Sequence, residues 1–194
     1  KHDFQRFGYP LPGTKSKVIV QYWDQSSLPP LIAQRMSAWS SNNPNWSHQC
    51  YDRQRASLFL GDHYGDALRE AFLDIRFAAM QADVFRVAYL LASGGLWIDA
   101  ATTSLIPVDE WLHENVSLLL LRRDHQEFPK VCNGLIYASG PGHPLLVKAW
   151  EKIFENLLAR RGASVYKNFG PRVFRDLFAT GIFDSDLACG SIKV

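Results

Sequence analysis

The residues best suited to chemistry lie in the middle of the chain, at Asp83, Arg86 and Asp99. Asp83 and Arg86 are three residues apart in an apolar segment, so on a helix they project from the same face. A Gly94-Gly95 pair follows, and then a short apolar strand that ends at Asp99. Ligands of open α/β sheets bind beyond the carboxyl ends of the strands, so Asp99 suits a divalent metal ion or a ligand that carries phosphate groups.

Each of these residues also has a structural explanation. Asp83 and Arg86 could form an ion pair with each other or with Arg76, because buried charges are costly unless they are paired. Asp99 could simply form a turn. The position two residues after Asp99, where a second carboxylate would strengthen a metal site, is Ala101.

Two further side chains are candidates for ligand binding. Trp23 ends the first predicted strand, where an indole could stack on a planar base or a sugar; the alternative is a core tryptophan. Asn133 could bond to a sugar hydroxyl, or form an Asn-Gly turn with Gly134. The single literal Asp-x-Asp sequence, at residues 184–186, is predicted to be a loop without a metal role.

The alternation of strands and helices predicts an α/β fold with a largely parallel sheet in one domain, residues 1–194. The predicted strands are 17–23, 46–51, 96–98, 117–121 and 133–139. The first predicted helix opens at Pro29-Pro30. One or two helices are predicted over 56–76, with breaks near Gly61 and Gly65, and two more over 79–92 and about 144–160.

The amino-acid composition disfavours several classes of function. The chain has 194 residues, 47% hydrophobic and 21% charged, with a net charge of +2, so it lacks the strong positive charge that is typical of nucleic-acid binding. Three widely spaced cysteines indicate neither a zinc site nor a disulfide framework, which favours a reducing compartment. No signal segment or apolar run long enough to cross a membrane is present in this sequence.

Several motifs, taken in order, resemble glycosyltransferase family 32 and the related capsular polysaccharide synthesis proteins, and more distantly the clostridial glucosylating toxins. The matching blocks cover roughly residues 17 to 175. They are Val18–Trp23 with Pro29-Pro30, Met36–Trp39 with Asn43–Trp46, Ala82–Asp99, Asn133–Ala138 with Gly142–Pro144, and Phe169–Pro171.

The resemblance implies a GT-A fold, with a mainly parallel, twisted sheet flanked by helices. It also implies transfer of a sugar from a UDP- or GDP-linked donor to a glycan or protein acceptor, with retention at the anomeric carbon. Trp23 would stack on the base, Asp83 would bond to sugar hydroxyls, Arg86 would hold the sugar or diphosphate, and Asp99 would face the ribose and the metal. The donor-binding residues implied in this way are Tyr22, Trp23, Asp83, Arg86, Gly95, Asp99 and Asn133, and the catalytic ones are Asp83, Arg86 and Asp99.

The implied cofactor is Mn²⁺ or Mg²⁺ at a weak site, since Ala101 replaces the second carboxylate of the family motif. The implied location is the bacterial cytoplasm, with at most a peripheral contact with the inner membrane. Family members continue past the Phe169–Pro171 block to a segment that closes over the donor, which we expect to be missing here. Two alternatives remain open: a degenerate relative that binds a glycan or a protein without catalysis, and an effector that glycosylates a host protein.

Overall fold

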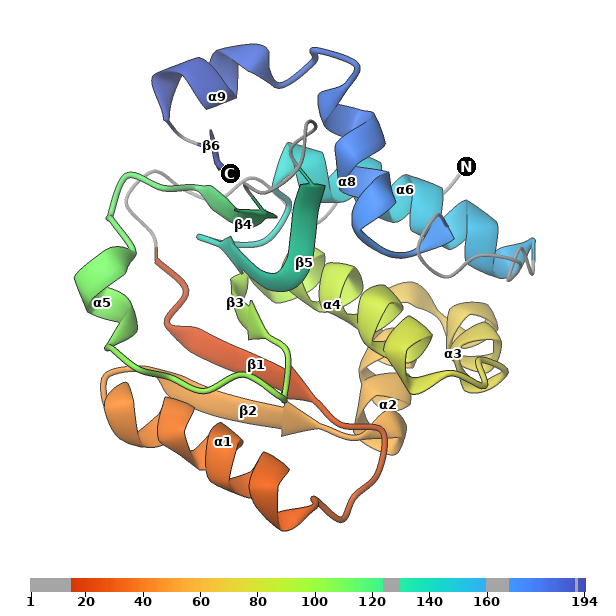
Figure 1. Cartoon of the computed structure of the whole chain (residues 1–194). Helices are drawn as coiled ribbons and strands as arrows, with labels where there is room; N and C mark the ends of the chain where they lie inside the picture. The colour runs from red at the N-terminus through yellow and green to blue at the C-terminus, as the bar shows by residue number, and fades with distance from the viewer. Residues whose placement is uncertain (1–14, 124–129, 160–167, 191) are drawn as a thin grey trace.

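A six-stranded sheet lies at the centre of the computed structural model, which describes residues 15–123, 130–159, 168–190 and 192–194. The strands are β1 (Val18–Tyr22), β2 (Ser47–Tyr51), β3 (Gly95–Ile98), β4 (Leu118–Arg123), β5 (Lys130–Ala138) and β6 (Ile192–Lys193). Their order across the sheet is β2-β1-β3-β5-β4-β6 (Figure 1).

The strands pair in both directions. β1 is parallel to β2 and β3, and β4 is parallel to β6, whereas β5 runs antiparallel to both β3 and β4. Three of these five pairings are therefore parallel. The predicted α/β class with a mainly parallel sheet is confirmed, and β5 is the strand that departs from it.

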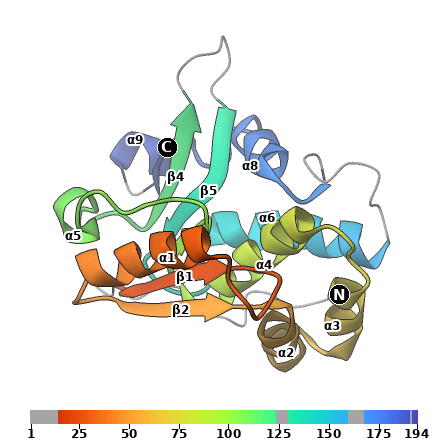
Figure 2. The same cartoon turned by 60° about the horizontal axis from the view of Figure 1, so that its bottom comes forward.

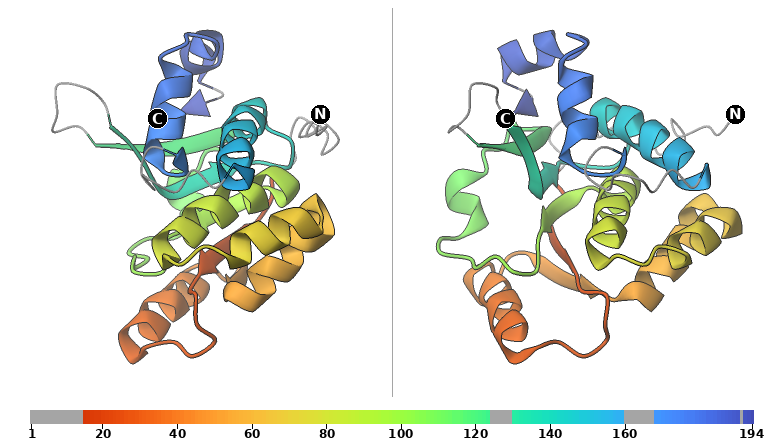
Figure 3. Two further views of the ribbon diagram at one scale, coloured as in Figure 1. Left: turned by 90° about the vertical axis from the view of Figure 1, so that its right-hand side faces the viewer. Right: turned by 45° about the vertical axis from the view of Figure 1, so that its right-hand side comes forward.

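Helices cover both faces of this sheet. They are α1 (Pro30–Asn42), α2 (Arg53–Tyr64), α3 (Asp66–Leu73), α4 (Ala78–Ser93), α5 (Val108–Trp111), α6 (Pro144–Leu158), α8 (Pro171–Phe178) and α9 (Asp184–Cys189). Figure 2 shows α1 lying along β1 and β2, and Figure 3 shows α4 between α6 and the α2–α3 pair.

The two faces follow from the alternation of side chains along each strand. Ile19 belongs to a buried cluster with Trp39 of α1 and Val108 of α5. The next residue, Val20, belongs to a larger cluster formed with side chains of α2, α3, α4, α6 and α8. Because α4 is buried on nearly every side, its polar residues are fixed by the packing of the core.

The reversal between α4 and β3 depends on two glycines. Gly94 and Gly95 have φ values of +68° and +107°. A Cβ atom at Gly94 would lie 2.6 Å from the Cα atom of Gly140, and one at Gly95 would lie 2.9 Å from the carbonyl oxygen of Val18. Glycine is therefore required at both positions, and the tight turn sends β3 back along α4, so that the middle of the helix meets the end of the strand.

The predicted break at Gly61 is wrong, and α2 begins earlier than predicted. Gly61 lies inside α2, since a glycine costs a helix only about 1 kcal/mol, which tertiary packing can offset. The break occurs at Gly65, where φ is +93°. The helix begins at Arg53 because the Asp52 side chain accepts a hydrogen bond from the backbone N–H of Arg55 at 2.8 Å.

Several short elements were not predicted: α5, α8, α9 and β6. They have two to eight residues, which is too few for a periodic pattern to stand out. Strand β5 begins at Lys130, ahead of the predicted start at Asn133. The loop predicted at residues 184–186 is instead the start of α9, where Asp184 and Asp186 lie in the first turn and favour the helix.

Replacing Gly94 tests the close approach at this turn. We expect Gly94→Ala to lower the free energy of unfolding by at least about 2 kcal/mol, because the new methyl group meets the backbone of Gly140 and the φ value is strained. Gly65→Ala is the matched control, since its φ is also strongly positive but no atom lies within 4 Å of the added Cβ. Urea unfolding of both variants measures the difference. An equal decrease in the free energy of unfolding of the two variants would show that the contact with Gly140 does not destabilise Gly94→Ala.

Candidate functional site

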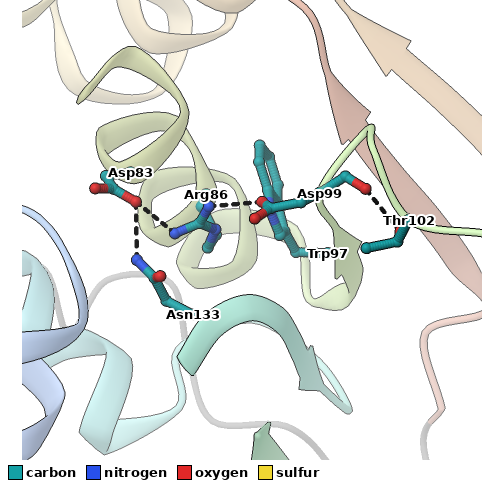
Figure 4. Close-up of polar contacts among 6 residues, drawn as sticks. All are labelled: Asp83, Arg86, Trp97, Asp99, Thr102 and Asn133. Carbon is teal, nitrogen blue, oxygen red and sulfur yellow. Dashed lines mark hydrogen bonds and ion pairs between the residues drawn. The ribbon is translucent and has the colours of Figure 1, made fainter. Parts of the chain in front are cut away.

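Three elements bring the predicted site residues together. Asp83 and Arg86 lie on α4, Asp99 follows the end of β3, and Asn133 lies on β5, the strand next to β3 in the sheet (Figure 4). Their side chains form one connected hydrogen-bond network. The sequence therefore identified four residues that the fold does place side by side.

Arg86 is the centre of this network. Its guanidinium donates from Nη1 to Asp83 Oδ1 at 2.6 Å and from Nη2 to Asp99 Oδ1 at 2.8 Å. Its Cζ atom lies 5.1 Å from the centroid of the Trp97 ring, within cation–π range. The side chain is only 3% exposed, so this cation is committed to the two carboxylates and the indole.

Asp83 is held by two donors at one oxygen. Oδ1 accepts from Arg86 and, at 2.8 Å, from the Asn133 side-chain amide. Burial raises the pKa of the Asp83 carboxyl above its usual value, while the Arg86 charge and the two hydrogen bonds act in the opposite direction. Asp83 therefore depends on Arg86 to remain charged in a site with little water.

Asp99 has one occupied and one available oxygen. Oδ1 accepts from Arg86 and from the Trp97 indole at 3.0 Å. Among the described residues, no hydrogen bond is made to Oδ2, and the side chain is 44% exposed. A Cβ atom at Gly134 would lie 2.8 Å from Oδ2, so the glycine keeps space open beside that oxygen.

The backbone fixes the position of this carboxylate. The Asp99 N–H donates to the Gly134 carbonyl at 2.9 Å, which joins the end of β3 to β5. The Thr102 N–H and hydroxyl both donate to the Asp99 carbonyl, at 3.0 Å and 2.7 Å. Asp99 therefore stands at the start of a closed turn rather than in a free loop.

The donor set for a metal ion is small. Within the described ranges, no group of three or more His, Cys, Asp or Glu side chains could hold a metal ion. Ala101 adds no carboxylate ligand, and Oδ2 of Asp99, which accepts no hydrogen bond among the described residues, is the candidate ligand for the ion. Such a site suits Mg²⁺ or Mn²⁺ only where phosphate oxygens and water complete the coordination.

Trp23 and Tyr22 lie at the end of β1 in different environments. Trp23 is half-buried and packs against a small cluster of Ile32, Met36 and Ala100, so it adjoins the turn that follows Asp99. Tyr22 is 5% exposed, and its hydroxyl donates to Gln81 Oε1 at 2.6 Å. Its burial raises the pKa of the phenol. The structure therefore places Tyr22 in the core and does not bring it to the Asp99 carboxylate.

Gly95 is also not part of the site. It begins β3, whereas Asp99 follows the other end of that four-residue strand. At about 3.3 Å per residue, the two are separated by the length of the strand. Gly95 is a glycine because of its backbone conformation and its approach to Val18, not because of a ligand.

Sequence reasoning missed two residues that shape the site, Trp97 and Gly134. Trp97 could have been found, because residues two apart on a strand lie on the same face and Trp97 is two residues before Asp99. Gly134 gave no such signal, since its role depends on where Oδ2 of Asp99 lies in space.

A cavity of about 780 Å³ lies beyond the start of α4, lined by Arg53, Phe77, Met80 and Phe169 among others. None of its described lining residues belongs to the Arg86 network. No helix in the described part of the chain is long and apolar enough to cross a membrane.

The chain is similar to known glycosyltransferases in sequence and in fold. Residues 29–118 match the family model described as a glycosyltransferase sugar-binding region containing a DXD motif. The chain is 25% identical over 165 residues to the initiation-specific alpha-1,6-mannosyltransferase of Schizosaccharomyces pombe. This match covers 71% of the chain and 41% of the relative. It is 28% identical over 125 residues to the Candida albicans protein of the same description. That match covers 59% of this chain and 32% of the relative.

The chain thus spans less than half the length of these curated relatives. The PaToxG glycosyltransferase structure superimposes with a TM-score of 0.69 at 16% sequence identity, covering 91% of this chain and 74% of that one. This likeness supports the predicted GT-A type of fold.

Removing Arg86 tests the network by its dependence on pH. We expect Arg86→Met to cost about 3–5 kcal/mol of stability at neutral pH, because it leaves the buried Asp83 carboxylate without its cation. Without Arg86, the pKa of Asp83 in the folded state is raised further above its value in the unfolded chain. A carboxyl with a raised folded-state pKa favours the folded state at low pH, and this contribution is lost as the pH rises through that pKa. Part of the loss should therefore disappear near pH 4.

The control is the double variant Asp83→Asn/Arg86→Met, which carries no charge at position 83. Its stability should change much less with pH than that of Arg86→Met in urea unfolding from pH 4 to pH 8. The same pH profile in both variants would mean that Asp83 is not the group that needs Arg86.

Proposed function

We propose that the chain transfers a sugar from a nucleotide-sugar donor to an acceptor, since residues 29–118 match the model of glycosyltransferase sugar-binding regions that contain a DXD motif. The observation that carries this proposal is the available Oδ2 atom of Asp99, held beside the Arg86 network and kept accessible by Gly134. It occupies the first position of the family motif, here Asp99-Ala100-Ala101.

Each network residue then has a distinct role. Asp83 accepts hydrogen bonds from donor sugar hydroxyls through its second oxygen, since Oδ1 is already bonded to Arg86 and Asn133. Arg86 acts as a positioning residue, because its guanidinium is buried and both terminal nitrogens are engaged. Asn133 fixes Asp83, and Trp23 offers its ring to the donor base.

Asp99 is the residue that faces the phosphate end of the donor. A Mg²⁺ or Mn²⁺ ion bound there would neutralise the charge that develops on the nucleoside diphosphate as it leaves. The protein contributes Oδ2 of Asp99 and orients it through Trp97 and Arg86. With one protein oxygen, this ion binds more weakly than at a site with two carboxylates.

The names of the curated relatives guide the choice of sugar. Both are mannosyltransferases, so we propose a hexosyl transfer in which mannose is the first donor sugar to test. Retention at the anomeric carbon and a glycan or protein acceptor remain expectations, which the resemblance to glycosyltransferase family 32 implies. A cytoplasmic location with at most peripheral membrane contact also stays a prediction.

The test of function is donor turnover. Purified chain is incubated with GDP-mannose, UDP-glucose or UDP-N-acetylglucosamine and Mn²⁺, with water as the acceptor of the sugar. Release of nucleoside diphosphate and the anomeric proton coupling of the sugar first released are followed by NMR. At least one donor should be consumed, and Asp99→Asn should reduce its turnover at least a hundredfold, in the range of other single electrostatic contacts. Release of nucleoside diphosphate from none of the donors, with or without the metal ion, would contradict the proposal.

Gly134→Ala provides a second, steric test of the same site. The added methyl group would lie 2.8 Å from Oδ2 of Asp99, so we expect donor affinity to fall at least tenfold while the chain stays folded. Gly61→Ala is the control, because there the added methyl meets the flexible side chain of Arg69 at 3.1 Å. Unchanged donor affinity in Gly134→Ala would show that Oδ2 does not face the donor.

A further inference from the structure

An arginine from α1 contacts the turn that presents Asp99. Arg35 donates from Nη1 to the carbonyl oxygen of Ala101 at 2.8 Å. The hydrogen bond from Thr102 N–H to the Asp99 carbonyl closes this turn, so Asp99 and Ala101 lie in the same four residues. A second cation therefore stands beside the carboxylate turn, brought there from a distant part of the sequence.

The charge of Arg35 is not neutralised within the described part of the chain. Arg86 is paired with two carboxylates, whereas no carboxylate lies within ion-pair distance of Arg35 among the described residues. The side chain is half-buried, and its remaining N–H groups have no partner in the described ranges. An arginine in this state can still bind an anion with two parallel hydrogen bonds.

Ala101 places no charged side chain beside Arg35. An aspartate at position 101 would place a carboxylate in the turn whose backbone Arg35 already contacts, where it could compete for this cation. Alanine removes that competitor. The residue that weakens the metal site therefore also leaves a cation free beside it.

A diphosphate at this place needs more positive charge than Arg86 supplies. Two carboxylates and Arg86 leave the network with one net negative charge. Phosphate groups placed beside this network would be repelled by its remaining negative charge. A donor diphosphate next to Oδ2 of Asp99 therefore requires a further cation.

We propose that Arg35 binds the diphosphate of the nucleotide donor and supplies there the charge that a metal ion held by two carboxylates would supply. This inference rests on the proposed function. It makes Ala101 a functional feature of the site, and it makes nucleotide binding less dependent on Mn²⁺ or Mg²⁺ than at a two-carboxylate site.

The test compares the nucleotide affinity of the 194-residue chain and its variants by isothermal titration calorimetry. GDP and UDP are titrated in EDTA and in Mn²⁺, and the tighter-binding nucleotide is used throughout. In EDTA, Arg35→Gln should raise the dissociation constant about tenfold or more, the effect of one lost charge-assisted phosphate contact. Arg35→Lys should raise the dissociation constant less than Arg35→Gln does, because lysine keeps the positive charge.

Arg69→Gln is the matched control, since Arg69 of α3 is also half-buried and has no carboxylate partner among the described residues. The dissociation constant of the nucleotide for Arg69→Gln should stay within about twofold of the wild-type value. This is much smaller than the roughly tenfold change expected for Arg35→Gln. Ala101→Asp should weaken binding in EDTA, because the new carboxylate pairs with Arg35, and Mn²⁺ should restore it.

The uncharged nucleoside separates a phosphate contact from a structural role. If Arg35 binds phosphate, Arg35→Gln leaves the affinity for guanosine or uridine unchanged. Equal losses for nucleoside and nucleotide, or a dissociation constant in Arg35→Gln equal to that of Arg69→Gln, would overturn the proposal. A wild-type chain that binds neither nucleotide, with or without Mn²⁺, would contradict the proposed function itself and this inference with it.

Discussion

The buried guanidinium of Arg86, shared between Asp83 and Asp99, is the interaction on which the site depends. Two carboxylates at such a place would repel each other, and the more buried one would lose its charge without a cation. Arg86 binds Oδ1 of each carboxylate, with Trp97 and Asn133 as further donors. The hydrogen bonds of this network within the described residues all fall on Oδ1 of the two carboxylates, so Arg86 both stabilises the site and determines which carboxylate oxygens remain accessible there.

The fold supplies the conditions that this arrangement needs. The Gly94-Gly95 turn sets α4 against β3, so that residues in the middle of the helix meet the residue that follows the strand. The antiparallel strand β5 then adds Asn133 and Gly134 from the other side. An all-parallel sheet would need a crossover connection between β3 and its neighbour, and β5 would present different residues to Asp99.

Much of this could be predicted from the sequence, because its strongest signals are local. The apolar run with charges at Asp83 and Arg86 indicated a buried helix with a functional face, and the residue after the next strand indicated the partner. The sequence could not show that Tyr22 bonds to Gln81 in the core, or that Gly95 lies at the far end of β3. It was also silent on Arg35, because a contact 66 residues away depends on how α1 packs across the sheet.

We infer that the Arg86 network marks the place where a nucleotide donor binds. A crystal structure of the chain with bound nucleoside diphosphate and Mn²⁺ would decide this. The diphosphate should lie beside Oδ2 of Asp99, within reach of Arg35, and the base should lie against Trp23. A nucleotide held instead in the cavity lined by Phe77, Met80 and Phe169, with Asp99 unengaged, would contradict it.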